Sequence, residues 1–154
     1  MIEIGQIAPV LEVVNDLGEV VDLKEVFREK YTVLYFYPKD MTPGCTQQAK
    51  DFNDHMDAIC DLQAQVIGVS TDSVSSHQRF KKKYGLQFNL IADDQAELCQ
   101  LYNVYKEKKN FGKVYQGICR STFLIDKQGC IVNMWFNVKV PGHVDEVVNY
   151  LTTV

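Results

Sequence analysis

The sequence predicts an α/β fold built on a mixed central β-sheet with helices on both faces. Strand-like and helix-like segments alternate along the chain, which favours this class. Two of the strand-like segments are short, continuous runs of β-branched and aromatic residues, typical of strands buried inside a sheet. The 154 residues contain no repeat, low-complexity tract or Pro/Gly/Ser-rich linker. This length favours one domain, residues 1–154, with a substantial core.

The N-terminal half opens with a predicted β-hairpin. Its strands, Leu11–Val14 and Glu19–Asp22, flank the turn signal Asn15–Gly18. The run Tyr31–Tyr37 (YTVLYFY) predicts a central strand, and Gln65–Ser70 (QVIGVS) predicts the next buried strand.

Helical spacing of apolar residues predicts the helices. One amphipathic helix is expected from Cys45 through Ile59, where apolar residues recur every three or four positions. Another is expected from about Ser73 to Tyr84, with Gly85 as its stop. Both would cover the sheet with an apolar face.

The C-terminal part begins with a short helix through Tyr102, capped by Asp93 and Asp94. The stretch Asn103–Ile118 is the least regular and is predicted as a long loop of the kind that often carries function. A hairpin and a last helix complete the chain. The hairpin strands are Arg120–Asp126 and Ile131–Asn137, and the helix carries Val144, Val147, Val148 and Leu151 at helical spacing.

Composition argues against several classes of function. Sixteen basic and twenty acidic residues give a formal net charge of −4, so neither nucleic acid nor an anionic membrane is an expected partner. No apolar run approaches the about 20 residues needed to cross a bilayer. The start, MIEIGQIAPV, has an early Glu and no basic region, unlike a secretory signal. We therefore expect a cytoplasmic protein.

Five cysteines stand at positions 45, 60, 99, 119 and 130. An odd number in a reducing compartment argues against a structural disulfide framework. No pair forms C-x-x-C, which argues against a thioredoxin-type dithiol and a zinc ribbon. Since a free cysteine is often a small buried hydrophobe, only its surroundings can mark one as reactive.

Cys45 has such surroundings. It follows the predicted central strand, and Pro43 has a φ angle suited to the first turn of a helix. Gly44 leaves space in which a small substrate could approach the backbone. Cys45 therefore starts a helix at the C-terminal end of a strand, where α/β folds bind ligands. Free N–H groups and the helix dipole favour its thiolate, so we interpret Cys45 as a nucleophile.

These residues resemble a known family. Pro38, Thr42 and Cys45 match the P-x-x-x-T-x-x-C signature of peroxiredoxins, and YFYPKDMTPGCT is similar to the bacterioferritin-comigratory (PrxQ-type) subgroup. Gly5–Pro9 resembles the family's G-x-x-A-P entry, and residues 112–126 resemble its G-K-x-Y-x-G-I-x-R-x-T-F-L-I-D block. The resemblance spans nearly the whole chain. It implies a thioredoxin-like fold and thiol-dependent reduction of hydrogen peroxide and organic hydroperoxides.

The resemblance also implies a role for each site residue. The Cys45 thiolate would attack the terminal peroxide oxygen, giving a sulfenic acid and expelling water or an alcohol. Thr42 would hydrogen-bond the sulfur or the peroxide oxygen. Arg120 would supply a guanidinium to the thiolate and the transition state, and Pro38 would shield the thiolate from bulk water. Neither a cofactor nor a metal is expected.

His55, His77 and His143 have no metal-like spacing and are expected at the surface.

An alternative function is a redox-sensing or thiol-binding module on the same scaffold, in which Cys45 is oxidised with little turnover. The presence of both Thr42 and Arg120 favours the enzyme.

The reduction of the sulfenic acid is where this sequence departs from its relatives. Many carry a second cysteine five residues after the first, and here that position is Lys50. Along one continuous helix, Cys60 would lie about 22 Å from Cys45. Its neighbour Ile59 belongs to the apolar stripe, so a packing role is expected for Cys60.

The remaining cysteines offer no clear partner. Cys119 precedes Arg120 in a strand, so it faces away if Arg120 faces the site. Cys99 and Cys130 stay open, because their distances from Cys45 do not follow from the sequence. We therefore predict a one-cysteine mechanism, in a monomer, with thioredoxin, glutaredoxin or glutathione as the external thiol.

Overall fold

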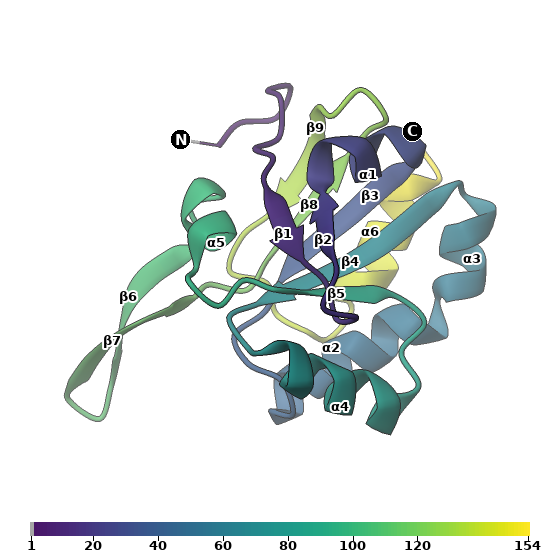
Figure 1. Cartoon of the computed structure of the whole chain (residues 1–154). Coiled ribbons are helices and arrows are strands. Elements are labelled where there is room, and N and C mark those ends of the chain that lie inside the picture. Colours follow the sequence, from purple (N-terminus) through teal and green to yellow (C-terminus); the bar gives the residue numbers. More distant parts are fainter. Residues whose placement is uncertain (1) are drawn as a thin grey trace.

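The centre of the computed structural model, which describes residues 2–154, is a five-stranded mixed sheet in the order β5-β4-β3-β8-β9 (Figure 1). The two strands on one side of β3 run parallel to it, and β8 on the other side runs antiparallel to both β3 and β9. The strands are β3 (Tyr31–Phe36), β4 (Ala64–Ser70), β5 (Asn89–Ala92), β8 (Ser121–Ile125) and β9 (Ile131–Trp135).

The predicted central strand is confirmed. Residues 32–37 are all buried, because β3 has a neighbour on each edge and a layer on each face. Its register pairs Tyr31 with Ala64 of β4 and Phe36 with Ser121 of β8. The end of β3 therefore lies directly beside the start of β8.

Helices cover both faces of the sheet, as predicted. Two separate hydrophobic clusters fill the two interfaces. The first face carries α2 (Pro43–Asp54), α3 (Met56–Asp61), α4 (Val74–Tyr84) and α6 (His143–Leu151). The second face carries α1 (Leu23–Glu29), α5 (Glu97–Leu101) and the predicted N-terminal hairpin of β1 (Glu12–Val14) and β2 (Val20–Asp22).

The single helix predicted from Cys45 to Ile59 is two helices, α2 and α3, which are separated at His55. The His55 ring donates from Nδ1 to the carbonyl of Asp51 at 2.7 Å, and its Nε2 lies 2.9 Å from Asp145 of α6. The Asp51 carbonyl thus accepts from the His55 ring, while the His55 backbone N–H donates to the Phe52 carbonyl at 3.1 Å. The apolar spacing runs across the break because both helices pack on the same face.

The loop predicted over Asn103–Ile118 is wrong. The chain forms an antiparallel hairpin of β6 (Tyr105–Asn110) and β7 (Lys113–Ile118), which projects from the body (Figure 1). Phe111 and Gly112 both have positive φ, at 51° and 76°, as a two-residue hairpin turn requires. Since most of its side chains are exposed, the hairpin has no buried face to produce a strand period in the sequence.

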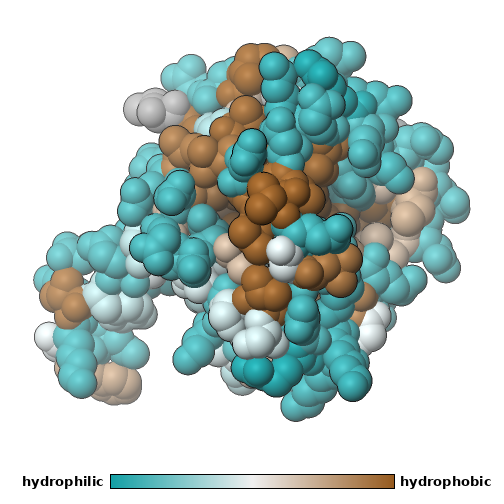
Figure 2. All heavy atoms as spheres, viewed as in Figure 1, coloured by the Kyte–Doolittle hydropathy of each residue, from teal (hydrophilic) through white to brown (hydrophobic). Residues whose placement is uncertain are grey.

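The face drawn in Figure 2 gathers hydrophobic surface over the N-terminal segment and hairpin. These segments expose Ile4, Ile7, Val10, Leu17 and Val20. Within residues 2–154, no helix has both the length and the apolar character needed to cross a membrane.

Candidate active site

Cys45 is the third residue of α2, and a short loop, residues 38–42, joins it to the end of β3. The thiol is buried, at 2 % exposure. Pro38 opens the loop and is half-buried, and Thr42 is the N-cap residue of α2. The structure thus brings three of the predicted site residues together at the carboxyl end of the central strand.

Arg120, 75 residues further along the chain, completes the cluster. Its Nη2 lies 3.5 Å from the Cys45 sulfur. The β3–β8 register explains the approach, because Arg120 immediately precedes Ser121, the partner of Phe36. A guanidinium beside the sulfur can stabilise negative charge as it moves from the sulfur onto a leaving oxygen.

Gly44 makes room for this guanidinium. A Cβ atom on Gly44 would lie 3.2 Å from Arg120 Nη2, tighter than most contacts of a real side chain. From the sequence, a small substrate was expected to approach the backbone in this space. In the structure, the Arg120 side chain lies against it.

Thr42 leaves the first turn of α2 uncapped. Its hydroxyl donates to the Lys39 carbonyl at 2.8 Å, and its side chain accepts no hydrogen bond from the helix. The N–H groups of Gly44 and Cys45 stand at helix positions without an intrahelical acceptor, so they remain available as donors to a peroxide. The hydroxyl proton of Thr42 points to Lys39 rather than to the sulfur, and its oxygen can still accept the O–H of a hydroperoxide.

Gln48 is a residue that sequence reasoning missed. It is completely buried, and its Oε1 accepts from Arg120 Nη1 at 2.6 Å. Its position three residues after Cys45 places both side chains on the same helix face, which was the available signal. Because the amide is neutral, Arg120 keeps its full charge toward the sulfur.

Tyr35 of β3 lies beneath the site, stacked on Phe52 of α2. Burial, followed by the charges of Cys45 and Asp40, raises the pKa of Tyr35 well above its ordinary value, against the opposing charge of Arg120. Its hydroxyl has no partner within the described residues. The site therefore contains a neutral phenol that keeps its proton.

The expectation that the histidines lie at the surface is wrong for His77 and His143, which are 0 % and 4 % exposed. Burial, with the nearby Arg120 adding to it and Glu146 opposing it, lowers the pKa of His143 to about 4. The ring forms a hydrogen bond with the Thr122 hydroxyl, which lies 2.8 Å from Nε2. Each buried histidine has a distant partner that spacing along the sequence cannot reveal.

His77 belongs to a group in which Asp40, Asp72 and His77 each place one potential metal ligand within 4.8 Å of the other two. These atoms already contact one another. His77 Nδ1 lies 2.7 Å from Asp40 Oδ2, and the Asp40 N–H donates to Asp72 Oδ2 at 2.8 Å. We therefore describe the group as a hydrogen-bonded network.

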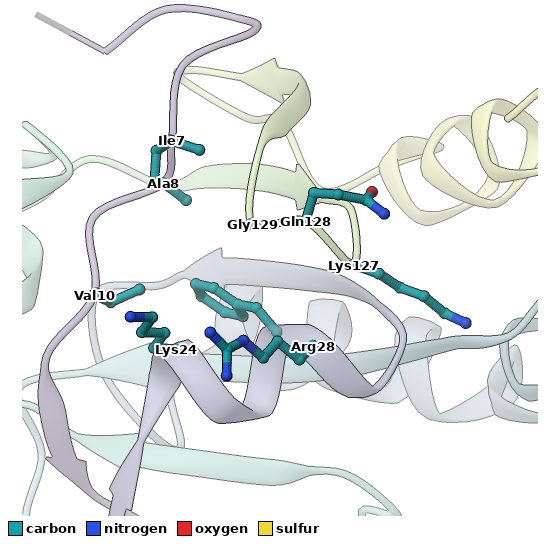
Figure 3. Close-up of a pocket in the computed structure, with 9 residues that line it drawn as sticks. Ile7, Ala8, Val10, Lys24, Arg28, Lys127, Gln128 and Gly129 are labelled. Atoms are coloured by element: carbon teal, nitrogen blue, oxygen red, sulfur yellow. The ribbon is translucent and has the colours of Figure 1, made fainter.

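A cavity of about 410 Å³ lies between α1, the N-terminal segment and the β8–β9 turn (Figure 3). Ala8 and Phe27 contribute apolar walls, and Lys24, Arg28 and Lys127 bring cationic side chains. The cavity contains none of the predicted site residues. It lies toward the end of the sheet where β3 begins, whereas Cys45 follows the end of β3.

Comparison with known proteins agrees with this arrangement. Residues 4–134 match the AhpC/TSA family. The chain is 53% identical over 150 residues to the peroxiredoxin Bcp of Bacillus subtilis, covering 97% of this chain and 95% of that protein.

Two solved structures are similar over nearly the whole chain. A Xylella fastidiosa PrxQ cysteine-to-serine mutant has a TM-score of 0.92 and 38% identity, covering 99% of this chain and 97% of that one. The bacterioferritin comigratory protein of Xanthomonas campestris, studied for alkyl peroxide reduction, has a TM-score of 0.87 and 40% identity, with coverages of 93% and 90%.

The thioredoxin-like fold and these relatives define the class as that of thiol-dependent peroxidases. The chain belongs to the AhpC/TSA family and, within it, to the Bcp (PrxQ) peroxiredoxins.

Proposed function

We propose that Cys45 is the peroxide-reducing nucleophile, with hydrogen peroxide and organic hydroperoxides as substrates, and that an external thiol reduces its sulfenic acid. The main support for this proposal is the 3.5 Å contact between Arg120 Nη2 and the Cys45 sulfur at the start of α2. The alkyl peroxide activity of the similar Xanthomonas campestris protein supports the organic substrates.

In the first half of the reaction, the thiolate attacks the terminal peroxide oxygen. A sulfur–oxygen bond forms, the O–O bond breaks, and the leaving oxygen takes a proton to become water or an alcohol. Arg120 and the N–H groups of Gly44 and Cys45 stabilise the charge as it moves onto the leaving oxygen. Thr42 orients the hydroperoxide through its hydroxyl, and Pro38 limits access of water.

In the second half, a thiol attacks the sulfenic acid, forming a mixed disulfide and releasing water, and a second thiol then restores Cys45. Thioredoxin, glutaredoxin and glutathione each supply such a thiol. The catalytic groups described above all come from one chain, so we propose that the enzyme acts as a monomer.

The positions of Cys60 and Cys99 support an external thiol. Cys60 is exposed rather than packed on the apolar stripe, and α3 places it near Ala64, at the opposite end of the sheet from Cys45. Cys99 is completely buried on the other face of the sheet. Burial and the neighbouring Asp93 raise the pKa of Cys99 far above its ordinary value, which makes it a poor nucleophile.

Cys119 and Cys130 also lie in other surroundings. Cys119 lines a cavity with Ile2 and Asn103, and Ile2 belongs to the hydrophobic cluster on the opposite face of the sheet from Cys45. Cys130 pairs with Ile7 beside the β8–β9 turn, at the end of the sheet remote from Cys45.

The experiment treats the protein with one equivalent of peroxide and then applies intact and peptide mass analysis without reductant. It tests both the assignment of Cys45 as the nucleophile and the use of an external thiol. With a sulfenic-acid trap present, the label is expected on Cys45, and steady turnover is expected only when an external thiol is added. Cys45→Ser should remain folded and inactive, and Cys60→Ser should behave as the wild type. A near-stoichiometric disulfide between Cys45 and another cysteine of the chain would overturn the one-cysteine mechanism, while oxidation without turnover would favour a redox sensor.

A further inference from the structure

Asp40 and His77 form a buried pair that the peroxidase chemistry does not use. Their side chains are 1 % and 0 % exposed, and His77 Nδ1 lies 2.7 Å from Asp40 Oδ2. Asp40 belongs to the loop of residues 38–42 that leads to Cys45, and His77 belongs to α4. The pair therefore joins the loop to a separate helix.

The neighbours of the pair fix its protons. His77 Nε2 lies 2.9 Å from the Ile91 carbonyl, which only accepts, so Nε2 carries a hydrogen. Asp40 accepts from the Tyr37 hydroxyl at 2.6 Å and from Ser76 Oγ at 2.8 Å. With these two donors on it, Asp40 acts as an acceptor toward His77, which requires a hydrogen on His77 Nδ1 as well. The ring is thus an imidazolium paired with a carboxylate.

A second carboxylate holds the backbone of the same loop. Asp72, which follows β4, accepts from the Asp40 N–H at 2.8 Å and from the Ser70 hydroxyl at 2.6 Å. Both the main chain and the side chain of Asp40 are therefore anchored.

The loop needs this anchoring because its next residue is strained. Met41 adopts φ of 68°, a left-handed conformation that costs free energy for a residue other than glycine. It separates the anchored Asp40 from Thr42, the N-cap of α2. A buried ion pair adds little net stability, so its value here lies in fixing one geometry of this loop.

We propose that His77 is a positioning residue: its imidazolium holds Asp40, and through Asp40 it sets the loop that presents Thr42 and Cys45 to the peroxide. This inference rests on the proposed function of Cys45. Loss of the His77 proton removes the charged donor from Asp40, releases the loop and slows oxidation of Cys45.

The predicted pH dependence has a definite sign. The groups that face the ring are Asp40 in the loop of residues 38–42, Tyr37 directly after β3, Asp72 after β4 and the Ile91 carbonyl of β5. Burial alone lowers the pKa of His77, but the hydrogen bond and charge of Asp40, with Ile91 and Asp72, outweigh it and raise the pKa above 6.5. The pair is therefore intact below pH 6.5 and is lost as the pH rises through the raised pKa.

The first test uses the reduced wild-type protein. Long-range ¹H–¹⁵N NMR should show both ring nitrogens of His77 protonated at pH 6. The second-order rate constant for peroxide oxidation of Cys45 should show a decline that follows the His77 titration. The NMR result does not depend on peroxidase activity, so failure of the proposed function and failure of this inference are distinguishable.

Variants test the route through Asp40. His77→Gln keeps a donor but no titratable charge, so its oxidation rate should fall on the order of tenfold and lose the alkaline decline. Asp40→Asn should have a similar effect, and the double variant should be no slower than either single one. Arg79→Gln removes a cation from an exposed site on the same helix and serves as the matched control with wild-type kinetics.

Three results would overturn the inference. One is a neutral His77 ring at pH 6 in the wild-type spectrum. Another is a wild-type rate without a decline that follows the His77 titration. The third is a His77→Gln profile with an unchanged alkaline decline. If either variant fails to fold, the wild-type spectrum and pH profile still decide the question.

Discussion

At the scale of single residues, Arg120 is the group whose removal should separate ionisation from catalysis. Its guanidinium contacts the Cys45 sulfur through Nη2 and Gln48 through Nη1. Arg120→Met removes the charge and the donor fork, so peroxide oxidation should slow on the order of 100-fold. Stopped-flow rates measured where the thiol is ionised in both proteins check this.

Lysine provides the matched comparison at this position. Arg120→Lys restores a charge but not the planar fork, so its rate should lie between those of the wild type and the methionine variant. A methionine variant that reaches the wild-type rate once its thiol is ionised would contradict a role for Arg120 in the transition state.

Gly44 offers a second prediction at the residue scale. Alanine stabilises a helix relative to glycine, but its Cβ would lie 3.2 Å from Arg120 Nη2. Gly44→Ala should therefore keep or raise the unfolding midpoint while lowering the rate of Cys45 oxidation several-fold. Gln47→Ala, at an exposed position of the same helix turn, should leave the rate unchanged; equal rates for both variants would show that Arg120 tolerates the contact.

At the scale of elements, the start of α6 carries an acid-sensitive contact. His143 opens this helix, packs against Trp135 of β9 and pairs with Thr122 of β8. Because burial lowers its pKa from 6.5 to about 4, the unfolded chain takes up a proton between these pH values and the folded chain does not. Stability should fall by about 3 kcal/mol as the pH drops across this range, at about 1.4 kcal/mol per pKa unit.

Urea unfolding as a function of pH measures this effect. His143→Gln should be less stable at neutral pH and show a shallower loss of stability between pH 6.5 and 4. His55→Gln, which replaces a half-buried histidine that bonds Asp51 and Asp145, serves as the comparison. An unchanged acid slope in the His143 variant would assign the loss to other groups.

The sequence could predict those helices and strands that a local pattern of residues indicates. The β-branched and aromatic run of β3 is buried from 32 to 37, and α4 has Ser73 as its N-cap and Gly85 as its C-cap. The His55 ring at the break between α2 and α3 contacts Asp145, 90 residues away. Local periodicity contains no information on such a contact.

At the scale of the whole molecule, the residues of the site also divide into those with a local signal in the sequence and those placed by contacts between distant residues. Cys45 could be singled out from its neighbours Pro43 and Gly44, because the turn that exposes its backbone donors is local. Arg120 could be linked to it only through the family resemblance, since the contact depends on the β3–β8 register. The burial of His77 depends on Asp40, 37 residues away, so sequence reasoning placed His77 at the surface.

The projecting β6–β7 hairpin has a consequence for chain connectivity. It joins the part of the chain with Cys45 to the part with Arg120, and it exposes Lys109 and Lys113 on either side of its turn. Limited trypsin digestion should cut here first. The two fragments should then stay associated, since β3 and β8 pair within the central sheet.

The nicked protein should keep most of its reactivity toward peroxide, as measured after gel filtration. Loss of reactivity in fragments that remain bound would mean that an intact hairpin is needed to place Arg120. If reactivity persists, the enzyme can be divided into two separately expressed pieces, one bearing the nucleophile and the other the guanidinium. Peroxide reduction would then report when the pieces meet.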